Sequence, residues 1–180
     1  MGWVLLVMVV TQVYDNVTGR NAPQNRVIVV PTPGPTVGPN ADITRMAELQ
    51  TCVASDPDNL DCVRELAALY YKLGQYEQAQ ANYEQAARLA PHDYDILVKL
   101  AGTYIFQLMF EEAVDTLRDA VVLKPDSPEI HLLLGLSLSK LEPPRLEEAK
   151  AEWQQVIKLA PGTEWAAQAA ELINAANSQR

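Results

Sequence analysis

Few residues of the types that most often carry chemistry occur in this 180-residue chain, which has two cysteines and two histidines. Cys52 and Cys62 fit neither a zinc-ligand spacing nor a Cys-X-X-Cys redox pair. His92 and His131 lie far apart in the sequence and have no ligand companions near them. The sequence therefore predicts no metal site and no cofactor.

Paired carboxylates, at Glu111-Glu112 and Glu147-Glu148, are the remaining candidates for acid–base catalysis. Each pair opens a predicted helix, where acidic side chains interact favourably with the helix dipole, and that position explains both pairs. The chain also has no glycine-rich phosphate loop, no Gly-X-Ser-X-Gly elbow and no His-Glu-X-X-His motif. We therefore predict no catalytic residues, no small-molecule substrate and no enzyme activity.

Acidic side chains dominate the larger part of the chain. The net charge is −9, and residues 41–180 alone carry −10. Such a balance repels phosphate backbones and predicts no nucleic-acid binding, while it favours the approach of basic partners. Alanine, leucine, glutamate and glutamine are frequent from residue 41 onward, and this composition favours an all-helical fold.

The elements that would position any functional side chain recur every 34 residues. The repeated positions include Pro57, Pro91 and Pro125; Leu66, Leu100 and Leu134; and Tyr70, Tyr104 and Leu138. In the third copy, the second half is shifted by two residues, which are inserted at Glu142-Pro143-Pro144. A turn between helices absorbs such an insertion. Each unit is therefore predicted to be a pair of amphipathic helices.

This pattern resembles that of the tetratricopeptide-repeat family over residues 41–177. The first copy supplies the motif residues Val63, Leu66, Ala67, Tyr70, Ala79, Tyr83, Ala86 and Pro91. The resemblance implies an all-α helical-repeat solenoid. Its expected parts are a leading helix at 41–56, repeats at 60–93, 94–127 and 128–163, and a capping helix at 164–177.

In that family, the first helix of each repeat lines a concave groove that binds polypeptides. The resemblance places exposed partner-binding positions, which we call the predicted groove, at Arg64, Ala68, Tyr71, Val98, Gly102, Ile105, Phe106, Leu132, Leu136 and Lys140. The middle of this set is apolar, although the internal core of the repeat uses other positions. Two occupants are open: an amphipathic helix or apolar peptide of a partner, and the N-terminal segment of this chain. Gly102 favours the partner because it lets another chain approach closely.

One family binding mode, the clamping of a terminal carboxylate, is disfavoured. Arg64 suits that mode, but Ala68 stands where the clamp has asparagine. Glu129 and Leu133 replace its basic pair.

The first residues of the chain form an apolar run, with Gly2 to Val10 reading GWVLLVMVV and further apolar residues reaching Tyr14. The run is about half as long as a membrane-spanning helix requires, and it lacks the features of a secretory signal. Three interpretations are open: part of a transmembrane helix that starts upstream, a short membrane anchor, or a strand or core segment of the soluble domain. The first two are favoured because residues 15–40 form a proline-rich linker, which suits a tether. We therefore predict a membrane-anchor or packing segment at 1–14.

The closing part of the repeat region, Ala151 to Ala176, is similar to the extracytoplasmic tetratricopeptide domains of c-type cytochrome maturation factors. That similarity implies a membrane-tethered module that binds a helical polypeptide, with its repeats on the extracytoplasmic side. The alternative function is a structural accessory subunit of a membrane complex. Cys52 and Cys62 fall near each other if the repeat assignment holds. They are then either a disulfide, which indicates an oxidising compartment, or two buried thiols.

Overall fold

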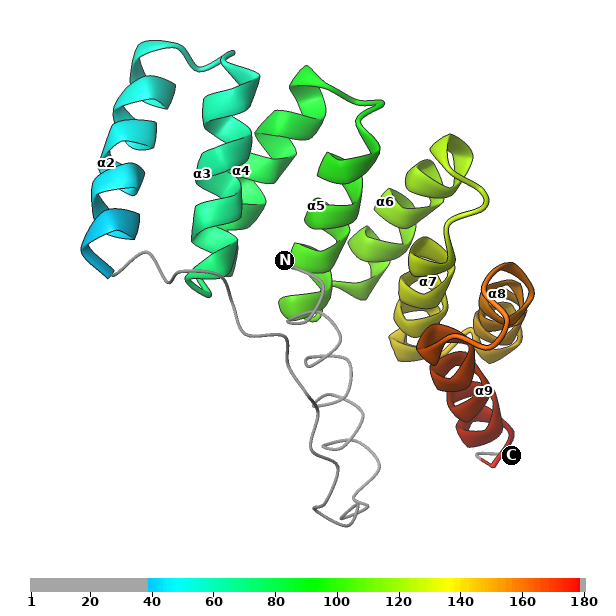
Figure 1. Ribbon diagram of the computed structural model, residues 1–180. Helices are drawn as coiled ribbons and strands as arrows, with labels where there is room; N and C mark the ends of the chain where they lie inside the picture. The colour runs from blue at the N-terminus through cyan, green and yellow to red at the C-terminus, as the bar shows by residue number, and fades with distance from the viewer. Residues whose placement is uncertain (1–38, 179–180) are drawn as a thin grey trace. The chain divides into compact units, whose positions relative to one another are not determined.

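The computed structural model describes residues 39–178, and within this range the chain forms eight helices and no strand (Figure 1). The helices are α2 (Pro39–Ser55), α3 (Leu60–Lys72), α4 (Tyr76–Leu89), α5 (Tyr94–Phe106), α6 (Phe110–Leu123), α7 (Pro128–Lys140), α8 (Leu146–Leu159) and α9 (Glu164–Asn177). The predicted all-α helical-repeat solenoid is confirmed. None of the described helices combines the length and the hydrophobicity needed to cross a bilayer.

Two compact units, Met1–Glu48 and Leu49–Arg180, divide within α2. Of the first unit, the structure describes residues 39–48, where Arg45 pairs with Glu48 at 3.1 Å. The predicted anchor segment and most of the predicted linker lie outside the described residues. The leading helix starts at Pro39, two residues before the expected position. Proline is well tolerated in the first turn of a helix because its missing N–H would have no intrahelical partner there.

In the second unit, helices adjacent in sequence pack against each other from α3 to α9. Figure 1 shows α3, α5 and α7 as the first helices of three successive pairs, with α4, α6 and α8 as the second. The turn after α3 uses Gly74 at φ 74°, a backbone conformation that glycine adopts without a steric penalty. Leu108 occupies the equivalent turn after α5 at φ 61°. These turns connect the two helices of each pair, and Figure 1 shows the first helices α3, α5 and α7 in one layer of the unit.

The recurring positions of the sequence are the buried ones. The motif alanines are fully buried at 67, 79, 86, 101, 113, 120 and 149. The large side chain between the two helices is Tyr83 in the first repeat, Leu117 in the second and Trp153 in the third, and all three are buried. Burial of these apolar side chains is the main source of stability for such a stack.

Polar contacts also join successive repeats. The Tyr104 hydroxyl donates to a Glu84 oxygen at 3.0 Å, and the Gln107 amide donates to Gln80 Oε1 at 2.8 Å. These bonds link α5 and the turn after it to α4.

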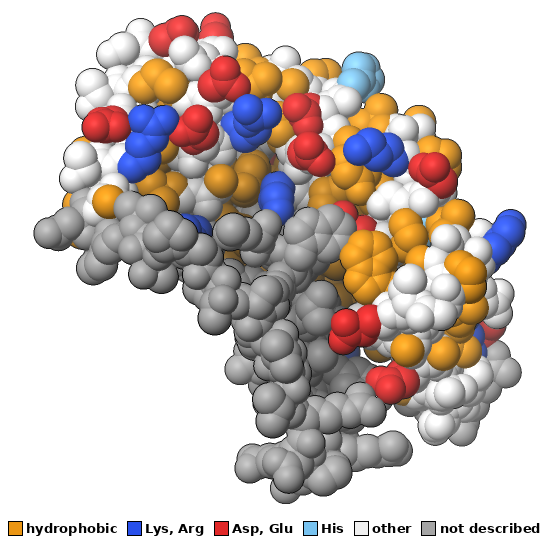
Figure 2. All heavy atoms as spheres, in the orientation of Figure 1, with side chains coloured by type: hydrophobic (Ala, Val, Ile, Leu, Met, Phe, Trp, Pro, Cys, Tyr) orange, Lys and Arg blue, Asp and Glu red, His pale blue; other side chains and the backbone are white. Residues whose placement is uncertain are grey.

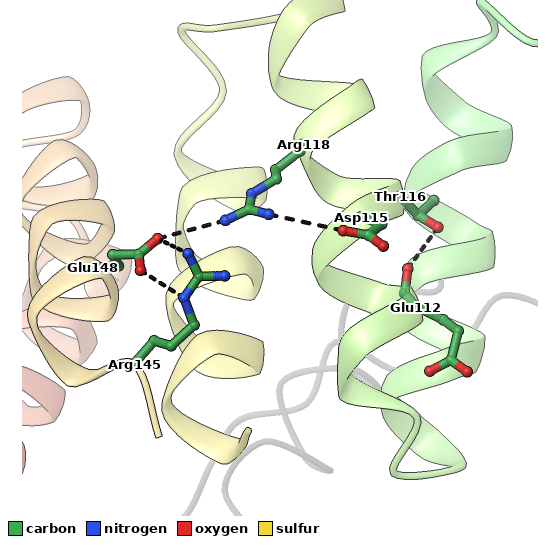
Figure 3. Close-up of polar contacts among 6 residues, drawn as sticks. All are labelled: Glu112, Asp115, Thr116, Arg118, Arg145 and Glu148. Atoms are coloured by element: carbon green, nitrogen blue, oxygen red, sulfur yellow. Dashed lines mark hydrogen bonds and ion pairs between the residues drawn. The ribbon is translucent and has the colours of Figure 1, made fainter. Parts of the chain in front are cut away.

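Between the second helices of two repeats, Arg118 of α6 lies between Asp115, which is on the same helix, and Glu148, which is on α8 (Figure 3). Arg145 holds the same Glu148 carboxylate through two hydrogen bonds of 2.6 Å. Because these groups are about half exposed, we expect each pair to add little to stability.

Covalent and polar contacts join the end of α2 to α3. Cys52 and Cys62 form a disulfide between the two helices. The Gln50 amide also donates to the Tyr70 hydroxyl at 2.8 Å. The first repeat is therefore tied to the helix that precedes it.

Candidate partner-binding groove

All ten residues of the predicted groove lie on the first helices of the repeats, α3, α5 and α7. The 34-residue period places them in equivalent rows. Arg64, Val98 and Leu132 form one row, and Ala68, Gly102 and Leu136 form another. Residues at equivalent positions of stacked repeats share one side of the stack.

The expected exposure of the predicted groove is correct on α3 and wrong on α5 and α7 for most residues. Arg64 and Ala68 are exposed. The buried members are Val98, Gly102, Ile105, Leu132 and Leu136, while Tyr71, Phe106 and Lys140 are partly buried. Every buried member is an aliphatic residue or glycine, and moving aliphatic side chains out of water is favourable.

Three aromatic rings gather where α3, α4 and α5 meet. Tyr76 and Phe106 are stacked with ring centroids 4.6 Å apart, and Tyr71 meets both rings edge to face. Burial, together with the neighbouring phenols Tyr76 and Tyr83, raises the pKa of Tyr71 well above its usual range. The cluster joins two residues of the predicted groove to Tyr76, which sequence reasoning placed in the repeat pattern only.

A buried carboxylate lies at the start of α7. Glu129 is 9 % exposed, and burial raises its pKa to about 7, although Lys99 and a hydrogen bond from Tyr94 act in the opposite direction. The Tyr94 hydroxyl lies 3.4 Å from a Glu129 oxygen and 2.9 Å from Ser127 Oγ. Lys124 Nζ sits 3.7 Å from the centre of the Tyr94 ring. The first turn of α7 is therefore a polar site beside an apolar surface.

Neither the Tyr94 contact nor the burial of Glu129 is visible in the sequence. Tyr94 is not a repeat motif position and was not among the predicted groove residues. Its 33-residue separation from Ser127 reflects the stacking of neighbouring repeats. The period of 34 was the available signal, because it brings residues of adjacent repeats together.

At the other end of α7, Lys140 is partly buried, and this burial lowers its pKa. Figure 2 shows acidic and basic side chains alternating near the starts of α3 and α5, with hydrophobic side chains between them. Arg64 pairs with Asp61 at 3.0 Å on α3, where both side chains are exposed. Charged side chains thus occur near the ends of the first helices of the repeats, and apolar side chains lie between these ends.

The remaining candidate residues have structural partners. His131 Nδ1 lies 2.6 Å from a Glu152 oxygen, and its Nε2 lies 2.9 Å from the Pro125 carbonyl oxygen. Within residues 39–178, no group of three or more His, Cys, Asp or Glu side chains is arranged to hold a metal ion. Glu111, Glu112, Glu147 and Glu148 fall in the first turns of α6 and α8.

Comparison with known proteins agrees with this geometry. A family model described as a tetratricopeptide repeat matches residues 72–136, which run from the end of α3 into α7. The fold is therefore the helical-repeat solenoid of tetratricopeptide proteins, as the period of 34 predicted, with α3, α5 and α7 as the first helices of the repeats.

Solved structures share the fold. The crystal structure of MamA superposes with a TM-score of 0.68 at 18 % identity, over 74 % of this chain and 75 % of that one. The first tetratricopeptide domain of Spaghetti (RPAP3), bound to an HSP90 peptide, gives a TM-score of 0.60 at 22 % identity. That match covers 69 % of this chain and 94 % of the RPAP3 chain.

A sequence relative is the BBSome complex member BBS4 homolog of Drosophila melanogaster, 26 % identical over 112 residues. The match covers 62 % of this chain but 23 % of the relative, so this chain spans about a quarter of that protein. These likenesses support the repeat assignment, and none of them carries the narrower resemblance to cytochrome maturation factors.

Proposed function

We propose that the tetratricopeptide domain binds an apolar or helical polypeptide segment along the predicted groove. One observation carries the proposal: α5 and α7 have Val98, Leu132 and Leu136 at groove positions where α3 has Arg64 or Ala68. These three side chains are buried, whereas Arg64 and Ala68 are exposed at the equivalent positions of α3, so the repeat motif itself does not require an apolar residue there. An apolar surface of this kind suits a partner that contributes a hydrophobic face.

The mode of binding differs from the capture of an acidic peptide end. The RPAP3 domain is bound to the HSP90 peptide SRMEEVD, which supports peptide binding by this fold in general. In the present chain, Arg64 is engaged by Asp61, and Glu129 lies where a basic clamp residue would be needed. We therefore expect apolar contacts to dominate the affinity.

Site-specific photo-crosslinking tests the proposal. A photoreactive phenylalanine analogue at Phe106, on the predicted groove, is expected to capture a polypeptide from native membranes solubilised in mild detergent. The matched control places the same analogue at Val122, which is 81 % exposed on α6, and it should capture little. Equal capture at both positions, or none at position 106, would overturn the groove as the binding surface.

The narrower form of the proposal is a membrane-tethered assembly or cytochrome-maturation factor with its repeats on the extracytoplasmic side. The apolar residues 2–14 and the proline-rich linker support the tether. The Cys52–Cys62 disulfide supports an oxidising compartment, since cytosolic proteins rarely keep such bonds.

Deleting residues 2–14 should move the protein from the membrane pellet to the supernatant, and retention in the pellet would contradict the tether. Unfolded c-type cytochromes crosslinked at position 106 would support the maturation role.

A second candidate is a structural accessory subunit of a membrane complex. The relative named as a BBSome complex member favours it, because that protein is part of an assembly. A fixed set of subunits that co-purifies at equal stoichiometry and resists salt would support the subunit role. Substoichiometric, reversible binding would support the binding module proposed first.

A further inference from the structure

We infer that the junction between the second and third repeats is a proton-sensitive switch: the third repeat packs firmly on the second while Glu129 and His131 both hold a proton, and this packing loosens when they release it. The junction comprises residues 124–127, which connect α6 to α7, and the first turn of α7. Both groups belong to the fold itself, so the switch needs no partner and does not depend on the proposed function.

His131 brings a titratable ring into a position that the other repeats fill with an aliphatic side chain. Its equivalents are Val63 in α3 and Leu97 in α5, and all three residues are buried. His131 Nδ1 lies 2.6 Å from a Glu152 oxygen of α8, and its Nε2 lies 2.9 Å from the Pro125 carbonyl oxygen. A neutral imidazole has one N–H and can serve only one of these acceptors, whereas the protonated ring serves both. Loss of the proton therefore breaks the link from α7 either to α8 or to the connection that follows α6.

Glu129 is a buried carboxyl group at a position where the other first helices have an exposed acid. Asp61 and Asp95 are exposed, while Glu129 is 9 % exposed. Among residues 39–178, the Tyr94 hydroxyl of α5 donates to it at 3.4 Å, and no lysine or arginine forms an ion pair with it. An ionised carboxylate is costly in such a place, so Glu129 favours the protonated form.

The charged groups that act on Glu129 come from the second repeat. Asp95 and Lys99 lie on α5 together with Tyr94, and Lys124 lies where α6 ends, with its ammonium 3.7 Å from the centre of the Tyr94 ring. Burial, with a smaller contribution from Asp95, raises the pKa of Glu129 to about 7, although the two lysines and the hydrogen bond from Tyr94 act in the opposite direction. Ionisation of Glu129 is therefore opposed at the contact between the second and third repeats.

The two groups respond to pH in the same direction. The carboxyl group of Glu129 has an ordinary pKa of 4.5, so its contribution to stability is complete below pH 4.5 and is lost as the pH rises through about 7. The hydrogen bond with Glu152 raises the pKa of His131 above 6.5, although burial opposes it. Its contribution is therefore complete below pH 6.5 and is lost as the pH rises through the raised pKa. Deprotonation of both groups thus weakens the junction between about pH 5 and pH 8.

The contacts that deprotonation weakens are confined to the third repeat and the adjoining edge of the second. Glu129 and His131 hold Tyr94 on α5, Pro125 in the connection and Glu152 on α8, and none of these groups belongs to α3 or α4. Parts of one fold can open separately when their local contacts differ in strength. We therefore expect the third repeat to open before the first as the pH rises.

Amide hydrogen exchange on the full-length protein at pH 5.5 and pH 8 tests the switch. After correction for the intrinsic pH dependence of exchange, the protection of α7 and α8 should fall at least about tenfold, since one bound proton changes an equilibrium constant by up to about tenfold per pH unit. The protection of α3 and α4 should fall less than about threefold. An equal fall in all helices, or no fall in α7 and α8, would overturn the switch before any variant is made.

Variants assign the effect to the two groups. Glu129→Gln keeps an acceptor for Tyr94, and His131→Leu restores the aliphatic residue of the second repeat, so each change should reduce the fall in α7 and α8. The double variant should show a fall of less than about threefold in every helix. The matched controls, Asp61→Asn and His92→Gln, replace an exposed acid and an exposed histidine and should keep the wild-type fall. A wild-type fall that survives in the double variant would show that other groups carry the pH dependence, and the switch would be rejected.

Discussion

Helices α3 and α7 occupy the same place in the first and third repeats, and they differ in how much of their surface is buried. On α3 the buried residues are Val63, Leu66, Ala67 and Leu69. On α7 every residue from Glu129 to Leu138 is buried. The repeat register makes one face of each helix part of the core, as in any amphipathic helix. The opposite face is free to vary, and the two helices use it differently.

This contrast separates the positions that every repeat buries from those whose burial differs between repeats. Leu66 and Leu134 are equivalent, and both are buried in the core. Arg64 and Leu132 are equivalent as well, yet the arginine is exposed and the leucine is 7 % exposed. The repeat motif therefore explains the first pair, while the second pair marks a position whose burial differs from one repeat to the next.

A charge introduced on each helix gives the largest expected difference. Leu132→Asp should lower the free energy of unfolding by at least about 3 kcal/mol, since it buries a charge without a partner. Arg64→Asp at the equivalent position of α3 should cost about 1 kcal/mol or less, because that site is exposed. Urea denaturation followed by circular dichroism measures both. Similar losses in the two variants would contradict the contrast between α3 and α7.

The disulfide provides the next test, because it supports the α3 end of the domain alone. Replacing Cys52 and Cys62 together by serine should lower the free energy of unfolding by about 2–3 kcal/mol, as the chain-entropy model gives for a short closed loop. Hydrogen exchange should accelerate in α2 and α3 and change little in α7. A uniform increase over all helices would show that the disulfide supports the whole stack instead.

Gly135 sharpens the comparison within the core. A Cβ atom at this position would lie 2.5 Å from Trp153 Nε1 and 3.0 Å from the Ala149 carbonyl oxygen. Gly135→Ala should therefore cost about 1–3 kcal/mol, even though alanine favours helices. Adding Trp153→Leu reproduces the alanine–leucine pair of the second repeat, Ala101 with Leu117, and should recover part of the loss. Additive effects of the two changes, measured by thermal unfolding, would mean that the two sites do not compensate each other.

His131 replaces an apolar core residue of the other repeats, Val63 in α3 and Leu97 in α5. Both of its ring nitrogens face oxygen acceptors, so both must carry hydrogen and the imidazolium form is favoured. The hydrogen bond to Glu152 raises the pKa of His131, and the Pro125 carbonyl adds to this, while burial alone would lower it.

A histidine with a raised pKa stabilises the fold fully below its unfolded pKa of about 6.5, and the effect is lost as pH rises through the folded pKa. The wild-type protein should therefore lose about 1 kcal/mol relative to His131→Leu between pH 5.5 and pH 8.5. Denaturation curves at the two values provide the measurement. A constant difference between the two proteins would contradict a charged His131.

Much of this molecule was predictable because the internal repeat is a local and redundant signal. Ala67 and Ala101 recur at a fixed spacing, and each lies where two helices approach closely. The groove positions were identified by the same register, but their exposure was misjudged at Val98 and Leu136. Periodicity locates a residue on a helix face, whereas burial depends on everything that packs against that face.

By itself, the sequence determined the helical class, the repeat register and the core positions that recur in every repeat, since each depends on spacing along one chain. Only the tertiary structure decided that Glu129 is buried without an ion pair, that Tyr71 and Phe106 share a cluster with Tyr76, and that His131 lies between two acceptors. Desolvation and ring packing depend on neighbours from other helices. Those neighbours come together only when the repeats stack.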